Sequence, residues 1–248
     1  TKKYGWVVVL TSGYNNSDDY GYLYFVNPKT GALLEKVQTG TTSRGLAQAS
    51  AYVIDYTDGT ADAIYAGDLD GQLWRFDVTA AKGSTAPYPA PTKLAVLTDA
   101  SGNAQPVTTA PLIEIHPLTR KRFVLVGTGQ LLASSDIGSQ AAQTFYAIID
   151  GTGGSFSVMG SPITRSNLTA VTSVLAGANL PSTSKGWYFD IGVGSTAAWR
   201  IVSSPAAYNG VVTFSQAFNT APVAVCVSTT GNSVGGDTST TTWTMNAS

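Results

Sequence analysis

The sequence predicts an all-β fold, a β-propeller formed as an arc or modified ring of four-stranded antiparallel blades. Three observations predict it: the composition, a near-repeat of paired apolar strands, and aromatic residues in the second strand of each pair. The 248 residues include 26 glycines, whereas glutamate occurs only at Glu35 and Glu114. Because helices favour Glu, Lys and Ala while turns favour Gly, this composition is typical of strands and turns.

The near-repeat consists of an apolar run that ends in small residues, then a turn or loop, then a strand with aromatic residues. Four pairs of segments follow this pattern: 6–13 with 22–31, 63–67 with 72–77, 123–129 with 144–153, and 210–215 with 241–246. The spacing is irregular, as in propellers whose blades carry loop insertions. Asp70-Gly71 between two such strands is a hairpin signal.

Radial stacking gives this repeat a physical basis, because a four-stranded sheet cannot bury its faces alone. Each blade covers the next, and glycine near a strand end lets backbones approach closely near the axis. The alternative fold is a β-sandwich, whose strands are also separated by frequent turns. We expect residues 1–248 to form a single propeller domain within a longer chain, since the sequence begins at Thr1 without methionine or a signal peptide.

Glycine, serine and proline mark the expected joints and loops at 82–91, 182–186 and 231–242, while 167–178 fits either a short strand or a helical turn. The formal net charge of −1, with no basic run, argues against binding of nucleic acid or anionic membranes by charge. The longest apolar stretches are far shorter than the ~20 residues of a membrane helix. The single cysteine, Cys226, excludes an internal disulfide.

The stretch 65–77, Tyr-Ala-Gly-Asp-Leu-Asp-Gly-Gln-Leu-Trp-Arg-Phe-Asp, resembles the C-terminal β-propeller of the PilY/PilC family, the tip-associated adhesins of type IV pili. Further similar motifs follow in the same order, so that the resemblance runs from about residue 4 to about residue 215; they lie at 13–15, 22–33, 107–111, 126–132, 134–136, 143–146, 186–190 and 209–214. The segment after Ala217 departs from the family pattern.

The resemblance implies an exported protein of the pilus tip, cell surface or outer membrane. It also implies a non-catalytic adhesin that promotes pilus biogenesis with pilins or minor pilins as partners and binds a host or abiotic surface. Family propellers often carry an aspartate-rich calcium loop just before the Ala-Gly-Asp-Leu strand, so the resemblance implies possible calcium regulation as well.

The matching loop here places five candidate calcium ligands within eight residues: Asp55, Thr57, Asp58, Thr60 and Asp62. Calcium takes six to eight hard oxygen ligands, and alternating positions around a glycine turn can supply them. The loop is one residue shorter between Asp55 and Asp58 than the family pattern, so an ordinary Asp-Gly hairpin with solvated carboxylates stays open. The acidic segment 15–19 is expected to be a plain turn.

Enzyme functions find little support in the residues. His116 is the only histidine and precedes a proline in a predicted turn, and no His/Cys cluster suggests zinc. Two alternatives stay open. A quinoprotein dehydrogenase would share the Asn27-Pro-Lys-Thr-Gly31 pattern and Trp74, and a passive scaffold propeller would lack the metal loop. We expect the tryptophans to pack between sheets: Trp6, Trp74, Trp187, Trp199 and Trp243.

Overall fold

A computed structural model of the chain describes residues 1–246 except 15, 41–42, 173–179, 194–197, 209–210 and 219–238, and only the backbone of 239–246. Nearly all regular structure in this part is β. The only helices described are two single 3₁₀ turns, η1 (Ser134–Asp136) and η2 (Arg165–Asn167). No helix in the described ranges is long and apolar enough to span a membrane.

The strands form four sheets that follow one another along the chain. The first sheet contains β1 (Val8–Thr11), β2 (Tyr22–Val26) and β3 (Leu33–Gln38), and the second contains β4 (Ala49–Tyr52), β5 (Ala63–Gly67), β6 (Gln72–Asp77) and β7 (Thr92–Val96). The third, in spatial order, contains β11 (Thr169–Ala170), β12 (Gly186–Asp190), β10 (Thr144–Thr152), β9 (Lys121–Gly127) and β8 (Leu112–Ile115). The fourth contains β13 (Ala206–Tyr208), β14 (Val211–Phe218) and β15 (Ser239–Asn246).

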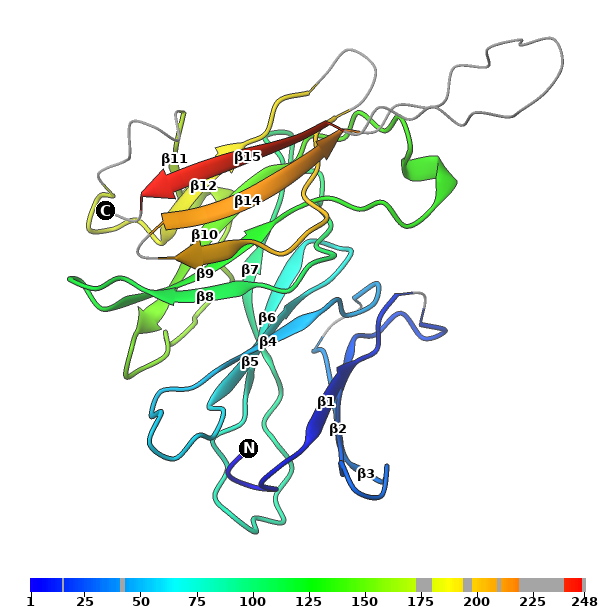
Figure 1. Ribbon diagram of the computed structural model, residues 1–248, viewed down its shortest axis with the longest axis vertical. Helices are drawn as coiled ribbons and strands as arrows, with labels where there is room; N and C mark the ends of the chain where they lie inside the picture. Colours follow the sequence, from blue (N-terminus) through cyan, green and yellow to red (C-terminus); the bar gives the residue numbers. More distant parts are fainter. Residues whose placement is uncertain are drawn as a thin grey trace, which may run out of the picture.

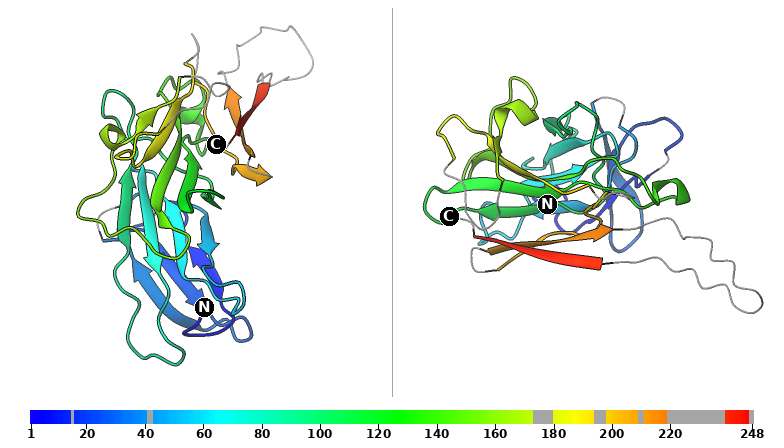
Figure 2. Two further views of the ribbon diagram at one scale, coloured as in Figure 1. Left: turned by 90° about the vertical axis from the view of Figure 1, so that its left-hand side faces the viewer. Right: turned by 90° about the horizontal axis from the view of Figure 1, so that it is seen from above.

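These sheets confirm the predicted all-β propeller fold and the four strand pairs. Among the described residues only the second sheet has the expected four strands, and β11 pairs parallel to β12 in the third. β5 pairs antiparallel with β6 in the register Ile64↔Phe76, β9 pairs with β10, and β14 pairs with β15. The sheets are arranged in chain order along the long axis, from the blue first sheet through cyan and green to the orange and red fourth (Figure 1). Figure 2 shows the same order from a second side.

Apolar clusters lie between successive sheets and stabilise the packing of each sheet against the next. Leu23 and Phe25 of the first sheet belong to one cluster with Trp74 and Phe76 of the second. A second cluster joins Tyr65 and Leu73 to residues of β9 and β10. Between the third and fourth sheets, Phe145 stacks on Phe214 with ring centroids 4.2 Å apart.

Three linkers join successive sheets, and all three lie at the same end of the strands, which we call the linker end. They comprise residues 39–48, 97–111 and 191–205. The central strands end there in glycine so that the linkers can cross them. A Cβ on Gly67 would lie 2.4 Å from Cγ1 of Val107, and one on Gly127 would lie 2.4 Å from Cγ2 of Ile201. Val107 and Ile201 are both fully buried, so each linker packs closely against the glycine at the end of the strand that it crosses.

Three sequence expectations need correction or a narrower statement. The segment 82–91 lies within the second sheet, between β6 and β7, and does not join two blades. Trp6 is 92% exposed, so it is not a packing residue, whereas Trp74 is 1% exposed and Trp187 and Trp199 pack against the third cluster. The ambiguous segment 167–178 begins with the end of η2 and β11, and its remainder from 173 lies outside the described residues, as do Cys226 and the side chain of Trp243.

Candidate functional site

The acidic loop 53–62 connects β4 to β5 at the end of the second sheet opposite the linker end. Asp55 and Asp58 each begin a tight Asp-x-Thr turn. Asp55 Oδ1 accepts hydrogen bonds from the backbone N–H of Thr57 at 2.9 Å and from its hydroxyl at 2.6 Å. Asp58 Oδ1 accepts the same two bonds from Thr60, both at 2.8 Å.

These short-range bonds also lower the pKa values of both carboxyls. The hydroxyl and N–H of Thr57 lower the pKa of Asp55, and the N–H and hydroxyl of Thr60 lower the pKa of Asp58. Asp77 and Thr79 repeat the geometry elsewhere in the second sheet, with bonds of 2.9 and 2.6 Å. The two threonines of the acidic loop therefore act here as turn-closing residues.

Asp62 does not take part in these Asp-x-Thr turns and accepts a different hydrogen bond. Its Oδ2 accepts the backbone N–H of Ile54 at 2.6 Å, which closes the base of the loop against β4. Lys2 Nζ lies 3.7 Å from Oδ2 of Asp58. In the described part of the chain, no group of three or more His, Cys, Asp or Glu side chains is placed to hold a metal ion.

Two other sequence candidates form turns. In the acidic segment 15–19, Asp18 Oδ1 accepts the N–H of Tyr20 and its other oxygen accepts the hydroxyl of Tyr22, while Asn15 lies outside the described residues. His116 Nδ1 accepts the N–H groups of Leu118 and Thr119 at 3.2 and 3.1 Å. The histidine thus shapes the β8–β9 turn, as expected from sequence.

Asp68, in the Ala-Gly-Asp-Leu motif, has the most heavily bonded carboxylate of the linker end. It is fully buried, and burial raises its pKa despite its hydrogen-bond donors. The donors are the backbone N–H groups of Asp70 and Gln72, Nε1 of Trp74 at 2.9 Å and the hydroxyl of Ser43 at 2.6 Å. One side chain therefore fixes the β5–β6 turn, the buried tryptophan and the linker from the first sheet.

A buried ionic cluster joins the second and third sheets. Asp150 accepts Nη1 of Arg75 at 2.5 Å and the hydroxyl of Tyr65 at 2.7 Å. Arg122, which has no solvent exposure, donates to the carbonyl oxygens of Asp150, Gly153 and Ser155 at 2.7, 3.2 and 3.3 Å. Its guanidinium carbon lies 4.3 Å from the ring centroids of both Tyr52 and Phe156. The hydrogen bonds of the cluster connect the second sheet to the third, and the charged side chains that make them are buried.

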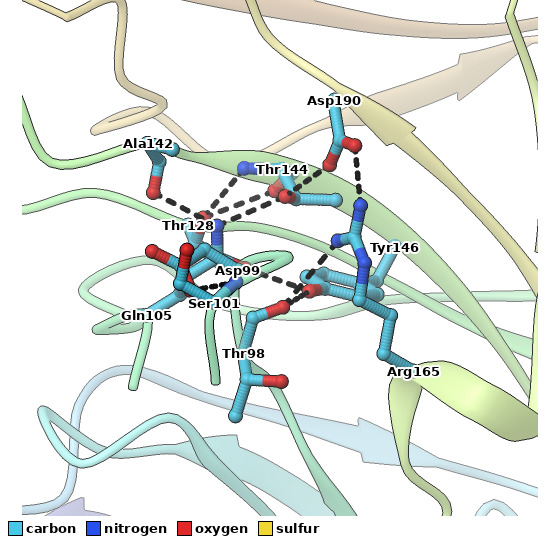
Figure 3. A network of polar contacts seen from close by, with 10 residues as sticks. All are labelled: Thr98, Asp99, Ser101, Gln105, Thr128, Ala142, Thr144, Tyr146, Arg165 and Asp190. Carbon is cyan, nitrogen blue, oxygen red and sulfur yellow. Dashed lines mark hydrogen bonds and ion pairs between the residues drawn. The ribbon is translucent and has the colours of Figure 1, made fainter. Parts of the chain in front are cut away.

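A second polar network at the linker end also joins these sheets (Figure 3). The Tyr146 hydroxyl lies 2.7 Å from the carbonyl oxygen of Thr98 and 2.7 Å from Oε1 of Gln105. Gln105 Nε2 donates to the carbonyl oxygen of Ala142 and to Oγ1 of Thr144, at 2.8 and 2.9 Å. Burial raises the pKa of Tyr146 to about 12, so the phenol stays a donor at neutral pH.

The outer part of this network contains an ion pair. Thr144 Oγ1 donates to Oδ1 of Asp190 at 2.8 Å, and Asp190 pairs with Arg165. The Arg165 guanidinium carbon lies 3.8 Å from the ring centroid of Tyr188. The sequence singled out neither this network nor the ionic cluster. Both bring together side chains tens of residues apart, and their sequence signal is polar residues inside apolar strands.

Sheets that stack in chain order, share apolar clusters and are joined by linkers at one end define an arc of a β-propeller. Comparison with known families specifies this class. The family model of the PilY1 beta-propeller domain matches residues 1–180. The chain therefore belongs to the PilY1 β-propeller family, as the ordered sequence motifs predicted.

Curated relatives and a solved structure agree with this assignment. The type IV pilus biogenesis factor PilY1 of Pseudomonas aeruginosa PAO1 is 34% identical over 166 residues, covering 58% of this chain and 14% of the relative. A PilY1 homolog of Xylella fastidiosa Temecula1 is 32% identical over 145 residues, covering 58% of this chain and 11% of the relative. The crystal structure of the P. aeruginosa PilY1 C-terminal domain gives a TM-score of 0.70 at 28% identity, covering 85% of this chain and 52% of that one.

The matches therefore leave most of each curated relative, and about half of the solved domain, outside the comparison. The chain spans about a seventh of the P. aeruginosa factor and about half of the solved C-terminal domain.

Proposed function

We propose that this domain acts in the biogenesis of type IV pili and in pilus-mediated attachment, without catalysis. Its membership of the PilY1 propeller family carries the proposal, because the relatives that match it are named type IV pilus biogenesis factors. We place the protein, once exported, at the pilus tip, cell surface or outer membrane. Its partners would be pilins or minor pilins, with a host or abiotic surface as the target of attachment.

The distribution of polar side chains supports a binding role over a catalytic one. The buried charges of Asp68, Arg122 and Asp150 bond across turns and sheets, and the ring nitrogen Nδ1 of His116 serves its own turn. Such groups stabilise turns and the junctions between blades, and none of them is left to act on a substrate. A quinoprotein-like activity is tested by dye reduction with added quinone cofactor, and sustained turnover would replace the proposal.

The direct test uses a strain that lacks the gene for the full-length protein. Loss of surface pili and of attachment, measured by shearing and pilin immunoblot and by adhesion counts, is the expected result. Complementation with the full-length protein should restore both. Normal piliation and attachment in the deletion strain would refute the proposed function.

Calcium binding by the acidic loop is a separate proposal that rests on the family pattern. Asp55, Asp58 and Asp62, with the Thr60 carbonyl, would have to turn from their present hydrogen bonds toward one ion, and Lys2 would have to leave Asp58. Calorimetry with calcium alone should then show heat for the wild type and little for Asp58→Ala. Asp77→Ala is the matched control, because Asp77 closes the same kind of turn outside the loop. No heat with the wild type would establish the solvated hairpin instead.

A further inference from the structure

Lys3 is a buried lysine in the segment that precedes β1. Its side chain is 3% exposed, and its ammonium donates to Oε2 of Glu35 and to the carbonyl oxygen of Ala86, both at 2.7 Å. The same nitrogen lies 4.8 Å from the ring centroid of Tyr4 and 4.6 Å from that of Tyr88. A carboxylate, a carbonyl oxygen and two aromatic rings thus replace the water that an exposed ammonium would bind.

Glu35 on β3 is the ionic partner of Lys3. Its Oε1 accepts the backbone N–H of Tyr88 at 2.5 Å, and its Oε2 accepts the hydroxyl of Tyr4 at 2.8 Å as well as the ammonium. Burial alone would raise the pKa of Glu35, but these donors and the charge of Lys3 outweigh it, so that the pKa is lowered. Burial alone would lower the pKa of Lys3, but its bond to Glu35 contributes to a net rise. Both groups are therefore charged at neutral pH.

These two residues connect the first sheet to the second at the end opposite the linker end. Ala86 and Tyr88 lie in the loop between β6 and β7, beside the N-terminus (Figure 1). The bonds from Lys3 to Ala86 and from Tyr88 to Glu35 therefore cross between the sheets. A third crossing bond runs from the N–H of Gly83 to the carbonyl oxygen of Lys3 at 3.2 Å.

Elsewhere the first sheet meets the second through side chains and the linker. None of the described strands of the first sheet pairs with a strand of the second. The faces of the two sheets pack through one apolar cluster, in which Phe25 and Trp74 take part. At the linker end, Asp68 accepts the hydroxyl of Ser43 in the covalent linker. The first sheet can therefore separate from the second without breaking a strand ladder.

A buried ion pair suits a connection that is either fully closed or fully open. Its net contribution to stability is small, because taking both charges out of water offsets their attraction. Separating the partners inside the protein is costly, because each charge then stays buried without its partner. Lys3 and Glu35 therefore separate only when water reaches both, which requires that the first sheet moves away from the loop between β6 and β7.

We propose that Lys3 and Glu35 form a latch that keeps the first sheet closed on the second, and that release of the latch lets β1, β2 and β3 open as one unit. The linker end stays attached during this opening. Opening uncovers the apolar faces on which Phe25 and Trp74 lie, so the latch controls access to an apolar surface inside the arc. The latch is independent of the proposed function, because local opening requires no pilus partner.

Hydrogen exchange of the full-length protein, followed by mass spectrometry, tests the latch with Lys3→Met. Methionine keeps an apolar side chain of similar length and removes the ammonium. We expect backbone exchange in β2 and β3 to become about tenfold faster or more, while exchange in β10 of the third sheet stays unchanged. The matched control is Lys2→Met, because the neighbouring Lys2 side chain is 58% exposed and lies 3.7 Å from Asp58. The control should exchange like the wild type.

A second variant and a double variant test whether the two charges act as a pair. Glu35→Gln keeps an oxygen for the N–H of Tyr88 and removes the negative charge, so it should accelerate exchange in β2 and β3 as Lys3→Met does. Lys3→Met/Glu35→Gln leaves no unpaired charge. Its acceleration should therefore be smaller than the product of the two single effects.

The other outcomes overturn the latch. Unchanged exchange in β2 and β3 would show that the ion pair does not hold the sheet. Equal acceleration in β2 and β10 would show that the pair contributes to the stability of the whole domain, and single variants that do not fold would show the same, because a latch leaves the other sheets folded. Acceleration confined to residues 1–7 would show that Lys3 holds only its own segment. Single effects that simply multiply in the double variant would show that the two charges do not act as a pair.

Discussion

The carboxylate of Asp68 accepts four hydrogen bonds although its side chain is fully buried. Its two oxygens accept hydrogen bonds from two backbone N–H groups, the indole N–H of Trp74 and the hydroxyl of Ser43. The four hydrogen bonds add little net stability, because a hydrated carboxylate in the unfolded chain makes equivalent bonds to water. Removing the carboxylate is costly, because it leaves several buried donors unpaired at once. The Asp of the Ala-Gly-Asp-Leu motif is thus explained by the interior of the protein and not by a ligand.

We therefore predict that Asp68→Ala lowers the free energy of unfolding by about 3–5 kcal/mol, measured by urea denaturation. Asp70→Ala is the control two residues away. Its carboxylate pairs with Arg44, which is exposed, so the loss should stay below about 1 kcal/mol. Similar losses for the two variants would contradict the assignment of Asp68 as the central acceptor.

Gly67 supports a second prediction, based on the close approach of a linker. An alanine there would place Cβ 2.4 Å from Cγ1 of Val107, in a fully buried contact. We expect Gly67→Ala to cost about 1–3 kcal/mol of stability. A Cβ at position 67 would also lie 2.5 Å from Cβ of Val107, so the clash is removed in the double variant Gly67→Ala/Val107→Gly, where the combined loss should be smaller than the sum of the single losses by about 1 kcal/mol or more. Strict additivity would show that the linker does not press on this glycine.

At the scale of elements, the junction between the second and third sheets depends on polar networks as well as on the apolar cluster. Tyr146 on β10 reaches across to the linker carbonyl of Thr98 and to Gln105. Because its phenol is the donor, the junction requires the protonated form. The pKa of about 12 in the folded protein exceeds the ordinary value of 10.0, so the folded state holds this proton more tightly than the unfolded chain.

The sign of the pH dependence follows from that difference. The contribution of Tyr146 is complete below pH 10 and is lost as the pH rises from 10 toward 12, because the unfolded chain ionises first. We predict that the free energy of unfolding of the wild type falls between pH 9 and pH 11 by roughly 1 kcal/mol more than that of Tyr146→Phe. Parallel pH profiles, measured by urea denaturation at pH 9 and 11, would exclude the buried phenol as the source.

The central strand pairs could be predicted from sequence because their signal is local. Apolar runs such as Phe123–Gly127 and Ala63–Gly67 end in glycine, and a second aromatic strand follows. The hairpin turn between β5 and β6 could also be predicted, from the dipeptide Asp70-Gly71. The sheets that these pairs build, and their order along the chain, follow from the same repeats.

The junctions could not be predicted, because their partners are far apart in sequence. Arg75 meets Asp150 and Arg200 meets the loop around Asp136 only after the sheets have stacked, and neither pair has a characteristic spacing. Composition misled in one place: Trp6 lies in an apolar run, yet it precedes β1 and is 92% exposed. In the acidic loop the residue types suit calcium, and they alone do not reveal that the same carboxylate oxygens accept local hydrogen bonds in Asp-x-Thr turns.

At the scale of the whole molecule, the sheets differ in how much of their surface their neighbours cover. The second and third sheets have an apolar cluster on each face, since each lies between two others. Among the described residues the first sheet packs through one face, and its other side exposes Val8, Leu10 and Leu33 by 41%, 50% and 56%. Local stability in a stacked array depends on such neighbour contacts, so it should fall from the central sheets toward the first.

Hydrogen exchange followed by mass spectrometry tests this gradient. β5, in which all five residues are buried, and β10, in which the first seven are buried, should have the slowest backbone exchange in the described chain. β1, an edge strand with alternating exposed and half-buried residues, should exchange fastest among the strands of the first three sheets. Asp68→Ala should speed exchange in β5 and β6 and also in β2, because Asp68 bonds Ser43 in the linker between the two sheets. Uniform protection of β1 and β5 would contradict the gradient and would show instead that all sheets of the arc open as one cooperative unit.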